Sequence, residues 1–375
     1  MQVTAAAAAA MTQPPPPPTF PISTSAPGEG AIVARTLPNG ATGLEKMTYQ
    51  YPLKLISPPR PAERPSALVF LLSYGGGLVA GDRVNLSVDV GPGARLSLVT
   101  QGHTKVFKAP PLPSAPGVET TRQRMRARVA GAGAGLCLLP DPVQPFADSI
   151  YEQEQAFCLA PGASLCLLDW VTQGRAARGE DWDFARWVGR NEVWAVTEAA
   201  AAAAAEPFAP FSSGIGDGDD DNQDRRLLVR DAIVLDRQGA AAYAGTLSDT
   251  MHGHGVFGSL VLRGPLTRSL GEFFMAEFAA LPRIGARDFG GGGGDGDGDG
   301  DGDGDDDPLA AWRAERLALE RQHSVLWTAA AVRGCVVVKF GAAEVEGGRL
   351  WVGAMLAREG SVERNFGKDS MMCVR

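Results

Sequence analysis

The chain has 375 residues, of which 45% are hydrophobic and 21% are charged, and its formal net charge is −8. This composition supports a folded protein with a sizeable core, while the surplus of acidic residues argues against nucleic acid as a partner, because binding to phosphate backbones depends on Lys and Arg. No segment reaches the run of about 20 apolar residues that a membrane-spanning helix needs, so we expect no membrane partner.

Low-complexity tracts divide the chain. Residues 1–29 combine a run of Ala with Pro14 to Pro18, a composition that cannot pack a core, and we expect them to form a disordered tail. Residues 30–375 are expected to form a single domain. Tracts rich in Ala, Asp and Gly predict disordered insertions within it at 199–224 and 288–308.

The next signal along the chain is strand-like alternation. Val84, Leu86, Val88 and Val90 share one face, with polar residues between them, and the turn sequence Gly-Pro-Gly follows before alternation resumes over Arg95–Thr100. Other short apolar runs bounded by Gly, Pro or Asp predict further strands at Ser164–Trp170, Leu227–Leu235, Gly258–Leu262, Val332–Phe340 and Leu350–Met355.

Two segments have the spacing of helices. Apolar residues recur three and four positions apart in Leu266–Leu281 and in Pro308–Ala331, and Pro308 suits the first turn of a helix. Strands dominate all the same. We therefore predict a mainly β protein of layered β-sheets with a small helical portion of about two helices.

Three sequence runs resemble calcium- or nucleotide-binding motifs, but each lacks a residue or a structural context that the motif requires. The Asp-Gly run lacks the Glu that closes an EF-hand loop, and Gly253–Gly258 matches GxGxxG but precedes a strand-like segment instead of a helix. Gly367-Lys368 lacks the remaining residues of a phosphate-binding loop. The chain itself is therefore not expected to hydrolyse nucleotides.

A weak metal motif is the pair His252 and His254. In an extended segment, residues two apart share a face, so the pair could offer two nitrogen ligands for a transient metal contact. The alternative is an ordinary turn, because two ligands rarely suffice for a metal site and no acid or Cys is paired with them by spacing.

Cysteine usage and the first residues indicate the compartment. The five cysteines are scattered without a CxxC pair, which argues against disulfides and structural zinc and favours a reducing environment. A secretory or transit peptide would carry basic residues near its start, but no basic residue precedes Arg35. We expect a cytoplasmic protein.

Three ordered blocks resemble the UreD/UreH family of urease accessory proteins. The first block runs from Gly75–Asp82 (GGGLVAGD) through the strand that follows to Thr100–Lys108 (TQGHTKVFK), the second is Leu138–Phe146 (LLPDPVQPF), and the third is Leu168–Glu180 (LDWVTQGRAARGE). The resemblance extends over roughly residues 30–375 apart from the insertions, and the end of the chain looks like that of eukaryotic members.

The resemblance implies a chaperone of urease maturation that is not an enzyme. Such a protein binds apo-urease and a UreF-type accessory protein, which recruits a UreG-type GTPase, and its fold is β-rich with helically wound strands. Nickel passes through in transit, and no cofactor is bound tightly. Members of the family are thought to convey nickel through an internal polar tunnel to the urease active site.

The resemblance also suggests which residues line such a tunnel. The candidate carboxylates are Asp82, Asp141 and Glu180, and Thr100, Gln101, Thr104 and Lys105 lie near the same path. Each carboxylate also has a structural interpretation, since Asp82 could close a Gly-rich turn, Asp141 could cap a turn and Glu180 could pair with Arg178.

Two other classes of function remain as alternatives. A hydrolase that uses Asp141, Glu180 and His252 would need a preorganised pocket with a perturbed carboxylate. A metal-storage protein would need more ligands than four His and scattered Cys provide.

Overall fold

The computed structural model describes residues 26–59, 64–108, 120–197, 199, 225–243, 245–281 and 308–375. The expected tail at 1–29 lies outside these residues except for its last four, which turn into the first strand. The expected insertions at 199–224 and 288–308 also lie outside them, except for Ala199 and Pro308.

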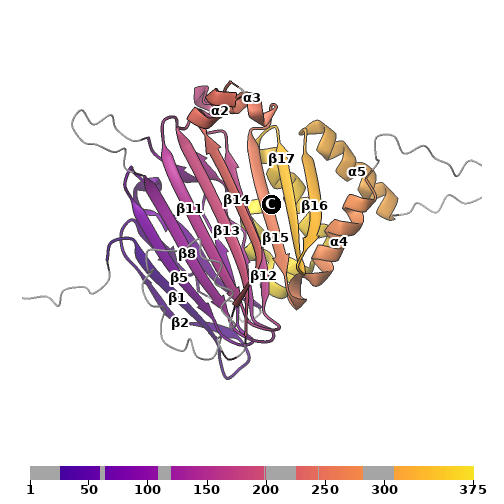
Figure 1. Cartoon of the computed structure of the whole chain (residues 1–375). Coiled ribbons are helices and arrows are strands. Elements are labelled where there is room, and N and C mark those ends of the chain that lie inside the picture. Colours follow the sequence, from indigo (N-terminus) through magenta and orange to yellow (C-terminus); the bar gives the residue numbers. More distant parts are fainter. Residues whose placement is uncertain are drawn as a thin grey trace, which may run out of the picture.

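One of the two large sheets has seven strands. They are ordered β14 (Arg225–Asp236), β13 (Arg186–Val196), β11 (Ile150–Leu159), β8 (Thr121–Val129), β5 (Arg83–Val90), β1 (Glu29–Thr36) and β2 (Thr42–Tyr49). From β1 to β13 the neighbours are parallel, and the edge strands β2 and β14 are antiparallel to theirs. In Figure 1 these strands lie side by side across the front of the molecule.

The other sheet has ten strands. Eight are ordered β16 (Leu326–Val332), β17 (Cys335–Ala342), β15 (Val256–Arg263), β12 (Ser164–Thr172), β9 (Gly135–Leu138), β6 (Arg95–Val99), β4 (Ala67–Ser73) and β3 (Leu53–Ile56). Two short strands, β7 (Thr104–Val106) and β10 (Val143–Pro145), pair with each other, and β10 also pairs with β12. In this sheet the neighbouring strands β4, β6, β9 and β12 are parallel to one another. The other pairs of long strands are antiparallel.

The chain winds between the two sheets. Apart from the short strands β7 and β10, the strands from β5 to β13 alternate between the sheets, with β5, β8, β11 and β13 in the seven-stranded sheet and β6, β9 and β12 in the other. Parallel neighbours arise because each circuit adds a strand beside the previous one in both sheets. The expected layered and helically wound β architecture is therefore what this part of the molecule shows.

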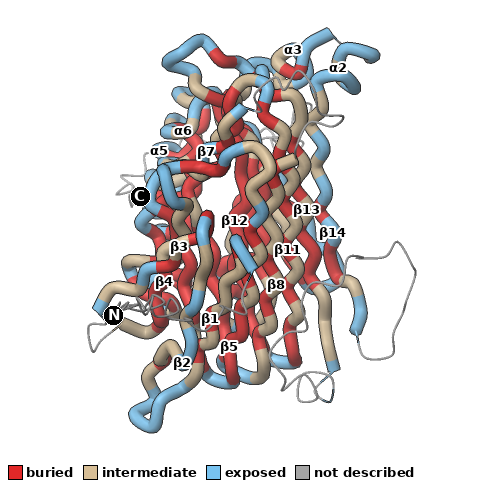
Figure 2. The backbone as a smooth tube through the Cα atoms, turned by 90° about the vertical axis from the view of Figure 1, so that its left-hand side faces the viewer, coloured by how far each residue is buried: buried red, intermediate tan, exposed pale blue. Residues whose placement is uncertain are grey.

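Alternating residues of the two sheets build the central core. In β11, for example, Tyr151, Gln153, Gln155 and Phe157 are buried, while the residues between them are partly exposed. Figure 2 shows this alternation of buried and intermediate positions along β8, β11 and β13. The strand periodicity of two thus turns one face of each strand toward the opposite sheet.

A second core lies between the ten-stranded sheet and the helices. The helices are α2 (Arg237–Tyr243), α3 (Leu247–Met251), α4 (Arg268–Ala279), α5 (Pro308–Gln322), α6 (Val345–Glu359) and α7 (Ser361–Phe366), with 3-10 turns η1 (Tyr74–Gly76), η2 (Ala176–Arg178), η3 (Pro265–Thr267) and η4 (Lys368–Val374). Leu168, Phe274, Phe340 and Trp351 pack together in this core. In Figure 1, α4 and α5 lie beside β16 and β17, whereas α2 and α3 lie at one end of the sheets.

Several predicted elements need correction. The helical portion exceeds the two helices expected, which correspond to α4 and α5. Leu350–Met355 was expected as a strand but lies inside α6, because a short apolar run does not distinguish a strand from a buried helix. Val332–Phe340 spans a two-residue turn between β16 and β17, at Arg333 and Gly334, which both have positive φ.

The expected helix Pro308–Ala331 is also too long. It ends at Gln322, and the residues from Leu326 onward form β16. Ser324 between them has a φ of 50°, a left-handed conformation that interrupts the helix. Helices and strands both bury apolar residues here, so the pattern alone did not mark the boundary.

Candidate functional site

The connections between the sheets differ in length at the two ends of the strands. Those from β5 to β6, from β8 to β9 and from β11 to β12 are turns of four or five residues, at 91–94, 130–134 and 160–163. The return connections at the opposite end are longer and contain residues 100–120, 139–149 and 173–185. All three blocks of the resemblance extend into these long connections.

Short strands join these blocks. Val143 and Gln144 in β10 pair with Thr104 and Lys105 in β7, and Val143 also pairs with Val171 in β12. Residues far apart in the sequence are thereby placed side by side at one end of the sheets.

Two glycines permit this close approach. A side chain at Gly77 would meet the backbone oxygen of Lys105 at 2.8 Å, so the Gly-rich segment packs directly on β7. Gly174 has a φ of 112°, and a Cβ there would lie 3.0 Å from Oε2 of Glu180 and 3.1 Å from the Pro145 oxygen. Glycine is needed at both places because no other residue fits these contacts without a shift.

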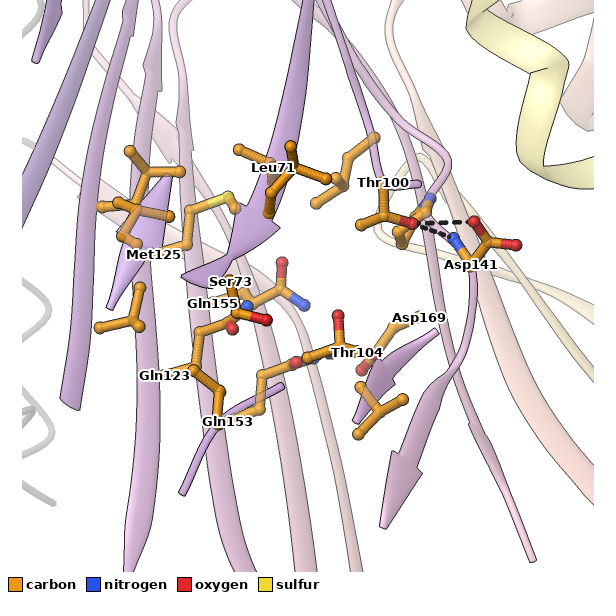
Figure 3. A pocket seen from close by; sticks show the side chains of 18 of the residues that line it. Leu71, Ser73, Thr100, Thr104, Gln123, Met125, Asp141, Gln153, Gln155 and Asp169 are labelled. Carbon is orange, nitrogen blue, oxygen red and sulfur yellow. Dashed lines mark hydrogen bonds between the residues drawn. The ribbon is translucent and has the colours of Figure 1, made fainter. Parts of the chain in front are cut away.

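A cavity with a mixed polar and apolar lining lies between the two sheets below these connections. Its volume is about 60 Å³, which is room for a few water molecules. The seven-stranded sheet contributes Gln123, Gln153 and Gln155, and the other sheet contributes Ser73, Thr104 and Asp169. Figure 3 shows these side chains directed toward a common space, with Thr100 and Asp141 on one side of it. Polar groups, including the cationic Arg124 of β8, therefore interrupt an otherwise apolar lining.

Asp141 is the candidate carboxylate that lines this cavity. It is buried, and its Oδ2 accepts hydrogen bonds from the Thr100 hydroxyl at 3.1 Å and from the Gly102 amide at 2.9 Å. Its own amide donates to the Thr100 hydroxyl at 2.7 Å, and Arg349 Nη2 donates to Oδ1 at 3.0 Å. Asp141 and Thr100 are thus fixed as a pair at the cavity wall.

A second buried carboxylate, Asp169, faces the cavity from β12. Gln153 Nε2 donates to it at 2.8 Å and Asn191 Nδ2 at 2.6 Å. Burial raises the pKa of the Asp169 carboxyl, the two amide hydrogen bonds oppose this rise, and the nearby charge of Asp231 adds to it. The cavity thus holds a carboxylate that is easier to protonate than one in water.

The raised pKa predicts a pH dependence of stability. Between the raised folded-state pKa of Asp169 and its ordinary value, the folded state binds more protons than the unfolded state, so this group's contribution to stability increases as the pH falls. As the pH is lowered from about 7 to about 4.5, we expect the free energy of unfolding of the wild type to rise relative to that of Asp169→Asn. Urea titrations at each pH measure this difference. Parallel pH profiles for the two proteins would contradict this expectation.

Glu180 lies at the other end of β10 from Asp141. It is buried, its oxygens accept hydrogen bonds from the Arg175 amide at 2.8 Å and from Arg175 Nε at 2.9 Å, and the Arg175 guanidinium makes a further short contact. Burial raises the pKa of Glu180, but the hydrogen bonds from Arg175 and from the Ala147 backbone outweigh it and leave the pKa lowered. Glu180 is outside the cavity lining, and its partner is Arg175 instead of the Arg178 considered above.

The other proposed path residues divide between the cavity and the surface. Thr100 and Thr104 line the cavity, whereas Gln101 and Lys105 are exposed. Asp82 lies at the end of the Gly-rich block, where its Oδ2 accepts the Val79 amide at 2.8 Å. This contact closes the turn, as the structural interpretation of Asp82 requires.

The pair His252 and His254 lies in a turn. His252 is exposed and ends α3 with a φ of 51°, so it is not in the extended segment that would place both rings on one face. His254 Nδ1 lies 3.0 Å from the Met251 oxygen, and its backbone oxygen accepts the Trp182 indole at 2.9 Å. Across the described residues, three or more His, Cys, Asp or Glu do not gather into a metal site.

Several site residues were not singled out from the sequence. Gln153 and Gln155 were detectable in principle, since they share the inward face of β11 with Tyr151 and Phe157. The thiol of Cys373 donates to the Thr100 oxygen at 3.4 Å, and burial raises its pKa to about 12, with the Asp141 charge adding to the rise.

His103 is also near this end of the cavity. Burial is the main cause that lowers its pKa, the charge of Asp141 raises it, and the charge of Arg349 lowers it further. Both His103 and Cys373 therefore favour their neutral forms beside Asp141.

The known proteins that this chain resembles are UreD-type urease accessory proteins. The sequence profile described as UreD urease accessory protein matches residues 27–368. A urease accessory protein ureD-like of Schizosaccharomyces pombe is 30% identical over 309 residues, which cover 81% of this chain and 84% of that protein. Urease accessory protein UreD of Sorangium cellulosum is 45% identical over 166 residues, or 44% of this chain and 49% of that protein.

A plant relative matches over a similar share of the chain. Urease accessory protein D of Arabidopsis thaliana is 37% identical over 147 residues, which cover 39% of this chain and 48% of that protein. The matched region thus spans about half the length of the Sorangium and Arabidopsis relatives. Separately, the helices in the described ranges include none with the length and apolar character that crossing a bilayer demands.

Proposed function

The chain belongs to the UreD urease accessory protein family, and on this premise we propose that it is a scaffold of urease maturation that conveys nickel to apo-urease. The family is one of accessory proteins, in agreement with the expectation that the chain is not an enzyme. The proposed partners are apo-urease and a UreF-type protein, through which a UreG-type GTPase joins the complex. We place the protein in the cytoplasm, where its partners would be met.

The observation that supports this proposal is the group of polar side chains at the cavity between the sheets. Thr100, Asp141 and Asp169 are hydrogen-bonded, so the core tolerates their burial, but apolar residues would fill the same space without needing such partners. Here, the cavity is lined by Thr100, Gln155, Asp141 and Asp169. Oxygen and amide groups of this kind bind a divalent ion weakly enough to release it again, which suits a cargo in transit.

The proposed path uses the residues that the family resemblance suggested. Thr100, Thr104 and Asp141 line the cavity itself. Glu180 lies on the connection 173–185, Asp82 lies at the end of the Gly-rich block before β5, and β10 links Asp141 to the neighbourhood of Glu180. We propose that these carboxylates mark successive positions of the ion, with exposed Gln101 and Lys105 near one opening. A transient metal contact at His252 and His254 remains a minor part of the proposal.

Reconstitution tests the proposed function. Apo-urease, the UreF-type protein, the GTPase, GTP and nickel are combined with and without this chain, and urease activity is measured. We expect activity to depend on the chain, because the other components lack its route to the urease active site. Equal activity without the chain, while the partners are competent with a known UreD protein, would reject the proposal.

The alternative functions find less support in the geometry. A hydrolase would need a carboxylate free to act as an acid or base, yet Asp141 and Glu180 are each engaged by an arginine. The lowered pKa of Glu180 is unsuited to a general acid near neutral pH. A storage protein would need a cluster of strong ligands, and the described residues form no such cluster.

A further inference from the structure

The carboxylate of Asp141 is occupied on both oxygens. Oδ2 accepts two hydrogen bonds, from Thr100 and Gly102, and Oδ1 accepts the Arg349 guanidinium at 3.0 Å. The positive charge of Arg349 therefore sits where a cation would have to bind. A divalent ion and Arg349 would repel each other if both contacted Oδ1, so they must compete for this oxygen.

Arg349 reaches the cavity wall from a different layer of the protein. It belongs to α6, whereas Thr100 and Asp141 follow strands of the ten-stranded sheet. Its side chain is 27% exposed, against 8% for Asp141, so part of the Arg349 side chain reaches solvent. Withdrawal of Arg349 would not require the sheets to separate.

The contact of Arg349 with Asp141 is not the strongest that these groups can form. A guanidinium and a carboxylate pair best through two parallel hydrogen bonds. Here one bond is formed, through Nη2, and Arg349 Nε is buried with no hydrogen-bond partner among the described residues. A buried N–H without a partner destabilises the closed arrangement and makes the ion pair easier to release.

The helix that carries Arg349 is coupled to a second contact on the same wall. A Cβ at Gly353 of α6 would meet the Val374 backbone oxygen at 2.0 Å, so α6 and η4 are in close backbone contact. Cys373 in η4 donates to the Thr100 oxygen at 3.4 Å. Arg349 of α6 and Cys373 of η4 thus contact the Thr100–Asp141 pair from two helical segments that pack against each other.

We propose that Arg349 closes Asp141 to cations in the free protein, and that the cargo ion reaches Asp141 only after Arg349 has withdrawn. This inference rests on the proposed function, in which Asp141 lies on the nickel path. It explains how a buried carboxylate on that path avoids retaining nickel before the partners assemble. Arg349 is therefore a positioning residue for delivery, since it acts on the ion through Asp141.

Nickel titration of the full chain tests this proposal. Ni²⁺ alone is titrated calorimetrically into the wild type, Arg349→Gln, Arg349→Met and Arg349→Lys, and melting temperatures verify that each variant is folded. We expect the two neutral variants to bind Ni²⁺ at least about tenfold more tightly than the wild type. Arg349→Lys keeps the charge and should resemble the wild type. The gain should vanish when Asp141→Asn is added to Arg349→Gln.

Two results would overturn the proposal. One is an unchanged affinity in either folded neutral variant, and the other is a gain that persists after Asp141→Asn. The methionine variant retains the apolar stem of the side chain, so it provides a second measurement if the glutamine variant does not fold. Urease activation by the wild type in the reconstituted mixture judges the proposed function separately: activation without a gain in the titration rejects only the role of Arg349.

Discussion

Asp141→Asn is expected to lower nickel-dependent urease activation by about tenfold or more in the reconstituted mixture, a factor that corresponds to about 1.4 kcal/mol. The substitution keeps the size and shape of the side chain but removes the charge that would attract a divalent ion at the cavity wall. Binding to apo-urease and to the UreF-type protein, measured by co-elution in gel filtration, should persist because Asp141 is buried.

A matched control separates this effect from a general loss of charge. Asp148→Asn makes the same chemical change at a carboxylate that is 55% exposed and pairs with Arg237, so activation should stay near the wild-type level. Full activation by Asp141→Asn would remove Asp141 from the nickel path. Loss of partner binding would instead assign Asp141 a role in the fold or in an interface.

Local patterns predicted several strands, although not β1, β2, β8, β11 or β13 of the seven-stranded sheet. Alternating apolar residues identified β5 at Arg83–Val90 and β6 after the Gly-Pro-Gly turn, and the predicted run Leu227–Leu235 lies within β14. These strands bury one face against the opposite sheet, so their side chains carry a period of two. The fully buried strand β12 was found from its length and flanking residues instead.

The helical layer was harder to predict because its packing overrides local preference. Gly347, Gly348 and Gly353 lower the helix propensity of α6, yet all three are buried where the helix lies close to neighbouring groups. A sequence window with three glycines and an apolar run therefore resembled a strand between turns. The close contacts that favour the helix are tertiary and leave no periodic signal.

The candidate site was only partly visible for a similar reason. The resemblance drew attention to Asp141 and Thr100, which are 41 residues apart and hydrogen-bonded. Arg349, the third member of this group, is 208 residues away from Asp141 in the sequence. Only the packing of α6 on the ten-stranded sheet brings them together, and a long-range contact of this kind has no signature in spacing or composition.

Arg316→Ala is expected to destabilise the fold by about 3–5 kcal/mol, because it removes one partner from a buried ion network. Arg316 donates to Glu320 Oε1 at 2.6 Å and lies 3.5 Å from Glu277 Oε2. The side chains of these three residues are only 2% (Arg316), 10% (Glu320) and 3% (Glu277) exposed. The indoles of Trp327 and Trp351 also donate to Glu320 Oε1, so the network joins α5 to β16 and α6.

Urea titration at neutral pH measures this loss through the midpoint and slope of unfolding. The control is Arg237→Ala, where arginine and carboxylate are 48% and 55% exposed, and a change of at most about 1 kcal/mol is expected. If Arg316→Ala lowers the free energy of unfolding no more than Arg237→Ala does, water or a rearranged Arg313 replaces the missing cation. Since α6 also carries Arg349, a large loss at Arg316 would further imply that this network fixes the helix from which Arg349 reaches Asp141.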